Sequence, residues 1–179
     1  MTKTFGRLLA VAIAASLLTL ASISVLITVR GIGPWQSLTV ANCQPEHPSS
    51  TQVLVSLNDN GGMMGGSAMM VGLNANVTTV ASGKVTFVAT NYGHMNHELL
   101  ILPLPTGGAG TRPLGANGKI DESSSLSEAS QSCATGVGNG ISPGTRSWTT
   151  VNLAPGNYEL LCDVPWHYAN GMFTTLTVQ

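Results

Sequence analysis

Charged side chains are scarce in this sequence of 179 residues. Lys, Arg, Asp and Glu together make up 8% of the residues, and the formal net charge is -1. A nucleic-acid-binding protein needs a basic surface, so this composition argues against such a partner. Aromatic residues are also few, at 5%, whereas 21 glycines and 9 prolines accompany many Val, Thr and Ser residues. These residue types favour short strands and turns over helices.

Charge is absent altogether from one stretch near the N-terminus. Residues 8–29 are all apolar or small, with Lys3 and Arg7 before them and Arg30 after them. A run of this length can cross a bilayer as one helix. We therefore expect residues 1–30 to be a single-pass anchor in the cell membrane, with the basic end in the cytoplasm. A signal segment, cleaved or uncleaved, is the alternative, although no A-x-A cleavage site follows the run.

The rest of the chain divides into a linker and one domain. Residues 31–50 contain Pro34, Pro48 and small polar residues, which is typical of a linker. Residues 51–179 are long enough for one β domain, which would lie outside the cytoplasm, in the periplasm or the extracellular space. Within it, residues 103–144 have an irregular, Gly- and Ser-rich composition, and we expect an insertion there with a short helix near residues 125–131.

One short stretch near the C-terminus carries three chemically distinctive side chains. Cys162, His167 and Met172 are spaced as C-x4-H-x4-M. A thiolate, two imidazoles and a weakly bound thioether form the ligand set of a blue copper site. The second imidazole would come from His97, with His94 as its rival.

Alternation along the predicted strands places these side chains on one interior face. His97 is in register with Leu99 and Ile101, and Cys162 is in register with Tyr158 and Leu160. Met172 shares its face with Leu176 and Val178. His94 lies three residues before His97 in a turn and does not begin the alternating row, which favours His97 as the ligand.

Both ligand segments resemble those of the cupredoxins, the small type 1 copper proteins. The stretch from Leu161 to Met172 is similar to their copper-binding loop, most closely in the sulfocyanin and rusticyanin type, and the stretch from Asn91 to Glu98 is similar to their upstream histidine segment. The resemblance covers roughly residues 53–178. One departure is Trp166, because such loops usually carry glycine before the histidine.

This resemblance implies an antiparallel Greek-key β-sandwich of about seven or eight strands and one copper ion that alternates between Cu(I) and Cu(II). It implies that His167 is the electron port, with Trp166 and Tyr168 beside it in an apolar docking patch. Asn91 and Glu98 would form hydrogen bonds that tie the two ligand segments together. The implied function is electron transfer between redox proteins, such as a respiratory-chain donor and acceptor, without enzymatic activity or a small-molecule substrate.

Several alternatives compete with this interpretation. An isolated buried His or Cys is usually a structural residue, but that explanation does not account for the spacing of all four side chains. Structural zinc sites rarely use Met, so the thioether favours copper. A copper enzyme would need more histidines, and only His47 and His94 are left over. Copper delivery or tolerance remains open.

The two remaining cysteines, Cys43 and Cys133, could form a disulfide in a domain outside the reducing cytosol, or could stay as free thiols.

Four of the seven methionines lie in the Gly-rich stretch at residues 63–70. This stretch could bind Cu(I), but a flexible loop that leads into a strand is the simpler interpretation.

Overall fold

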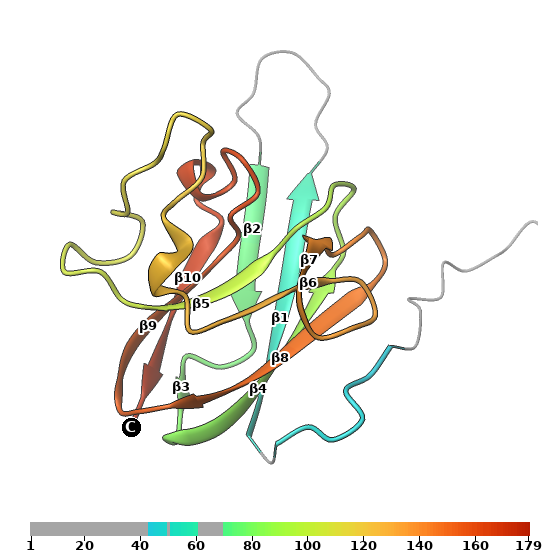
Figure 1. Ribbon diagram of the computed structural model, residues 1–179, viewed down its shortest axis with the longest axis vertical. Coiled ribbons are helices and arrows are strands. Elements are labelled where there is room, and N and C mark those ends of the chain that lie inside the picture. Colours follow the sequence, from blue (N-terminus) through green and yellow to red (C-terminus); the bar gives the residue numbers. More distant parts are fainter. Residues whose placement is uncertain (1–42, 50, 61–69) are drawn as a thin grey trace, which may run out of the picture. The chain divides into compact units, whose positions relative to one another are not determined.

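Two β-sheets pack against each other in the computed structural model, which describes residues 43–49, 51–60 and 70–179 (Figure 1). One sheet has the strand order β2-β1-β4-β8 and the other β3-β10-β9-β5-β6-β7. The strands are β1 (Thr51–Asn60), β2 (Met70–Ala75), β3 (Thr79–Val80), β4 (Gly83–Asn91), β5 (Leu99–Pro103), β6 (Ser127–Gln131), β7 (Gly136–Gly140), β8 (Arg146–Leu153), β9 (Gly156–Leu161) and β10 (Phe173–Val178). Two single-turn 3-10 helices, η1 (Glu122–Ser124) and η2 (Tyr168–Asn170), complete the described part.

The core between the sheets consists of the inward rows of both. Val53, Val55 and Leu57 of β1 are at most 2% exposed, as period-two alternation predicts. They share one apolar cluster with Leu160 of β9 and Leu176 of β10. The predicted β-sandwich is therefore confirmed.

Ten strands are present in the described residues, so the predicted number of seven or eight is too low. Three pairs are parallel, namely β1 with β4, β3 with β10 and β6 with β7, so the sheets are mixed rather than purely antiparallel. The expected helix at residues 125–131 is wrong. Those residues hold β6, which pairs with β5 and buries Ala129 opposite Leu99. The free edge of β5 can pair with a Ser-rich segment that its sequence pattern alone assigns to a loop.

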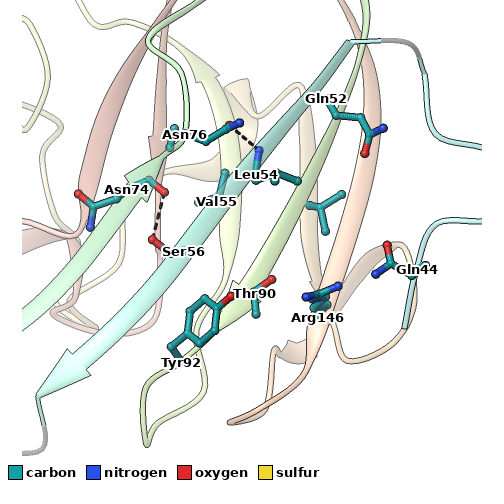
Figure 2. A pocket seen from close by; sticks show the side chains of 12 residues that line it. Gln44, Gln52, Leu54, Val55, Ser56, Asn74, Asn76, Thr90, Tyr92 and Arg146 are labelled. Carbon is teal, nitrogen blue, oxygen red and sulfur yellow. Dashed lines mark hydrogen bonds between the residues drawn. The ribbon is translucent and has the colours of Figure 1, made fainter. Parts of the chain in front are cut away.

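The outer face of the four-stranded sheet exposes one large apolar side chain of β1. Leu54 is 51% exposed. It lies in a groove of about 560 Å³, with polar side chains such as Gln52, Asn74 and Arg146 around it (Figure 2). Leu54 is thus an apolar residue on an otherwise polar row of β1.

The second half of the predicted linker is attached to the domain. A disulfide joins Cys43 to Cys133, with 4.9 Å between the Cα atoms. The backbone N–H of Ser49 donates to the Thr86 hydroxyl on β4 over 2.8 Å.

Among the residues that the structure describes, no helix is both long enough and apolar enough to cross a membrane. The predicted anchor at residues 1–30 lies outside the described residues, as does the Met-rich stretch except for Met70, the first residue of β2.

We expect removal of the disulfide to destabilise the domain substantially. The crosslink closes a sequence separation of 90 residues, and the chain-entropy model assigns about 4 to 5 kcal/mol to a loop of that size. The double variant Cys43→Ser/Cys133→Ser should lose this amount of unfolding free energy in urea titrations. A reducing agent should destabilise the wild-type protein equally and leave the variant unchanged. Equal stability of variant and wild type would contradict the prediction.

Candidate metal centre

Three metal-binding side chains meet at one end of the sandwich. The Nδ1 atoms of His97 and His167 lie 3.2 Å apart, and the Sγ atom of Cys162 lies 3.9 Å and 3.5 Å from them. All three side chains are buried, and their donor atoms lie within 4.8 Å of one another. Within the described residues, this is the one group of at least three His, Cys, Asp or Glu side chains that could hold a metal ion.

Neighbouring strands of one sheet carry these side chains to the same place. His97 precedes β5 and exchanges two backbone hydrogen bonds with Ile141, which precedes β8. Cys162 directly follows β9, the strand paired with β5. The position of the thiol beside His97 therefore follows from the register of β5 with β9.

The loop from Cys162 to Met172 is closed by its own backbone. The N–H of Cys162 donates to the carbonyl of Met172, and the N–H of Met172 donates to the carbonyl of His167, each over 3.1 Å. Met172 is fully buried and belongs to the same apolar cluster as Cys162. All four side chains that the sequence suggested as ligands are thus gathered in one buried region.

Burial favours the uncharged form of all three donors. Burial raises the pKa of the Cys162 thiol to about 12, although hydrogen bonds from the backbone N–H of Glu98 and Val164 act in the opposite direction. Burial also lowers the pKa of His167 to about 4, with repulsion from His97 as a smaller cause. The pKa of His97 is lowered by burial despite its contact with Asp59. These shifts favour the neutral imidazole, which is the form that binds metal.

Glu98 joins the two ligand segments as expected, whereas Asn91 does not. The backbone N–H of Glu98 donates to Cys162 Sγ over 3.3 Å, so its main chain rather than its carboxylate links the two ligand segments. Asn91 donates to the carbonyls of Met95 and Ile141 over 2.7 Å and 2.6 Å. Asn91 thus braces the turn before His97 and makes none of its hydrogen bonds to the Cys162 loop.

Asp59, near the end of β1, is a contact of the site that sequence reasoning missed. Its Oδ2 atom lies 2.9 Å from His97 Nε2 and also accepts the backbone N–H groups of His94 and Met95. Burial alone would raise the pKa of Asp59, but hydrogen bonds from Met95, His97 and His94 outweigh it and hold the pKa below its ordinary value. A carboxylate 38 residues away from His97 gives no spacing signal in the sequence.

A second carboxylate, Asp163, follows the thiol. Its Oδ1 accepts the backbone N–H of Ile120, and its Oδ2 lies 3.6 Å from the Lys119 ammonium. Burial raises its pKa to about 7, and Glu122 adds to the rise. The cation of Lys119 also lies 3.1 Å from Glu122 and 3.9 Å from Glu98, so one lysine serves three carboxylates beside the Cys162 loop.

The predicted port residues differ in their exposure. Trp166 is 53% exposed, whereas His167 is 2% exposed and Tyr168 is 3% exposed. The prediction that Tyr168 contributes to a docking surface is wrong, because its ring packs on Phe173 and its hydroxyl donates to buried Glu159. Tyr168 instead holds the loop onto β9.

Trp166 occupies a backbone conformation that explains why glycine is usual before this histidine. Its φ angle is 72°, in the left-handed region, which costs a residue with a side chain about 1 to 2 kcal/mol. Its N–H donates to the carbonyl of Gly118. A Cβ atom on Gly118 would lie 2.7 Å from the indole ring, so the ring lies directly against this glycine.

The site and the fold together define a class of protein. Two imidazoles, a thiol and a thioether at the end of a β-sandwich suit a type 1 copper ion, which takes two His and one Cys with a weak axial Met. Family comparison agrees, because residues 48–179 match the model described as "Sulfocyanin (SoxE) domain". The chain is a cupredoxin, and it belongs to the sulfocyanin (SoxE) family. It is a blue copper electron-transfer protein, and its cofactor is one type 1 copper ion.

Solved structures similar to this chain include a rusticyanin and an auracyanin. A reduced rusticyanin is 21% identical, with 73% of this chain and 81% of that chain covered and a TM-score of 0.44. A dithionite-reduced auracyanin from the photosynthetic bacterium Roseiflexus castenholzii is 21% identical, with 74% and 99% covered and a TM-score of 0.45. No curated protein matches the sequence significantly.

We expect copper loading to release one proton. Cys162, whose pKa is about 12, must lose its proton to bind copper, whereas burial lowers the pKa of both histidines and favours their neutral form. The apparent Cu(II) affinity should therefore rise about tenfold per pH unit between about pH 7 and 9. Competition titrations against a chelator of known pH dependence would measure this slope. A slope near zero would show that the thiol is already ionised, and a steeper one that a histidine must also lose a proton.

Proposed function

We propose that this chain is a membrane-anchored carrier of single electrons between redox proteins outside the cytoplasm, with His97, Cys162, His167 and Met172 as its copper ligands. The buried convergence of His97, Cys162 and His167 is the observation that carries the proposal. Sheet register and backbone hydrogen bonds hold the donor atoms facing one another. Such preorganisation favours rapid electron exchange, since little of the protein has to move.

The residues of the chain hold the geometry and exclude water, and bound copper supplies the one-electron couple between Cu(I) and Cu(II). The Cys162 loop is fixed by its backbone hydrogen bonds, and the Glu98 N–H holds the sulfur. An apolar, water-excluding surrounding is one of the factors that tune the potential of a metal site. A rigid site of this kind suits electron transfer better than substrate turnover, and we propose no enzymatic activity.

Trp166 is the best candidate for the docking contact with partner proteins. It is exposed, next to His167 in the chain, and flanked by exposed Pro165. Ala169, in the following turn, is exposed as well. Because His167 itself is almost covered, partners would approach it through this small apolar surface. Transient redox complexes need little contact area, and aromatic residues are enriched at interfaces. A donor or acceptor of a respiratory chain would be a suitable partner.

The location proposal is supported by two features of the chain. The disulfide between Cys43 and Cys133 suits an oxidising compartment. The charge-free stretch at residues 8–29, with Lys3 and Arg7 before it, has the length and flanks of a membrane helix whose short basic end faces the cytoplasm.

Copper delivery or tolerance is the second candidate, favoured by the Met-rich stretch at residues 63–70. Fully buried donors release metal slowly, which counts against delivery from the site itself. Loss of copper to an apo-acceptor within the time of electron exchange would favour this candidate.

We expect Trp166→Ala to slow electron transfer to a protein partner. Loss of an aromatic contact at the centre of an interface typically costs about 2 kcal/mol, a rate effect of roughly 30-fold. Stopped-flow oxidation of the Cu(I) protein by cytochrome c would measure it, and oxidation by hexacyanoferrate, which needs no protein interface, should change much less. The control is Leu54→Ala, also half exposed but on the outer face of the other sheet. Equal losses in both variants would contradict the docking role of Trp166.

We expect the full chain to fractionate with membranes. A helix formed by residues 8–29 should resist washes with high salt and alkaline carbonate, and a variant that starts at Val40 should be released in soluble form. N-terminal sequencing of the mature full chain separates the alternatives. A soluble mature protein whose first residue lies after residue 30 would show that the segment is a cleaved signal.

A further inference from the structure

Three side chains connect the buried metal centre to the protein surface. His97 Nε2 lies 2.9 Å from Asp59 Oδ2, and Asp59 Oδ1 lies 3.4 Å from Nδ1 of His94. The His97 and Asp59 side chains are 0% and 1% exposed, whereas that of His94 is 79% exposed. The carboxylate therefore touches a metal ligand on one side and a solvated imidazole on the other.

The turn that carries His94 is built around this carboxylate. Asp59 Oδ2 accepts the backbone N–H groups of His94 and Met95 over 2.7 Å and 3.0 Å. A Cβ atom on Gly93 would lie 2.0 Å from the same oxygen, so a residue with a side chain at position 93 would displace it. The close approach of Asp59 to His97 depends on this glycine.

The second oxygen of Asp59 has no hydrogen-bond partner among the described residues. A buried acceptor without a donor is costly, and such exceptions in native proteins call for an explanation. The His94 ring, whose Nδ1 atom lies 3.4 Å away, is the side chain placed to donate to this oxygen. A protonated His94 would supply the missing partner.

We propose that Asp59 and His94 form an outer charge relay to the copper ligand His97. Asp59 is the positioning residue, because it orients the His97 ring so that Nδ1 faces Cys162 Sγ. Its negative charge favours the more highly charged Cu(II) state, and a proton on His94 offsets that charge. With copper bound, each electron that arrives from a donor protein would therefore strengthen proton binding from solvent to His94, and each electron that leaves would weaken it again.

Few other groups can produce this coupling. Asp59 is the carboxylate in contact with the His94 ring, and the other titratable side chain that it contacts among the described residues is that of His97. Residues 61–69, which follow β1 in the sequence, contain no titratable side chain. Asp163 lies on the Cys162 side of the site, with Lys119 beside it. Its contribution would persist when His94 is replaced, so the two effects can be separated.

The test is the reduction potential of the copper-loaded full chain, measured by spectroelectrochemistry from pH 5 to 8. The wild-type potential should fall as the pH rises. Expressed as the equilibrium constant for reduction, the fall should be less than about tenfold per pH unit, which is the limit for one fully coupled proton. His94→Gln should remove the part of this dependence that belongs to the relay. His94→Lys, which keeps a positive charge, should hold the potential near its low-pH value throughout. His47→Gln is the matched control, because His47 is an exposed histidine in the segment before β1. It should leave the profile unchanged.

Asp59→Asn completes the double-mutant comparison. It should raise the potential at pH 8 and make a further His94→Gln change silent. If Asp59→Asn does not fold, the two His94 variants still decide the matter.

Identical pH profiles for wild type, His94→Gln and His94→Lys would overturn the relay. Because the relay rests on the proposed copper function, each potential is read together with the Cu(II) absorption spectrum. Loss of the type 1 spectrum in the wild type would count against the function, whereas a normal spectrum with identical profiles counts against the relay alone.

Discussion

The convergence of His97, Cys162 and His167 at the end of an apolar sandwich is the constraint on which the rest of the structure depends. Three polar donors are buried with no charge among them, and each needs support from its surroundings. The pairing of β5 with β9 sets the distance between His97 and Cys162. The backbone bonds inside the loop set the positions of His167 and Met172. Sheet register and loop closure therefore set the geometry of the site.

The surroundings of the site are asymmetric in charge. On the His97 side, Asp59 is held ionised by three donors and contacts the ligand directly. On the Cys162 side, the carboxylate of Asp163 is deprived of water, and its nearest cation, Lys119, is shared with two other carboxylates. Charges this close to a metal ion alter its potential more than they would in water, because the interior screens them weakly. Much of the chain's small supply of charged residues thus lies around the metal centre.

Sequence patterns predicted the sandwich and brought the four ligand candidates to one face, because period-two burial and the C-x4-H-x4-M spacing are local signals. They could not predict β6 and β7, whose Ser- and Gly-rich residues form strands only because β5 offers an edge to pair with. Asp59 was missed for a related reason, since its partner is distant in sequence and no local pattern marks it. The error at Tyr168 arose because an aromatic residue beside an expected port was assumed to face solvent, whereas Glu159 accepts a hydrogen bond from its hydroxyl inside the protein.

Cys162 and the two histidines are placed to form a type 1 copper site. The decisive measurement is the visible absorption and electron paramagnetic resonance spectrum after addition of one equivalent of Cu(II), with Cys162→Ser as control. We expect an intense blue or green thiolate-to-copper band with a narrow hyperfine splitting, both absent from the control. A colourless protein with an ordinary Cu(II) spectrum would contradict it.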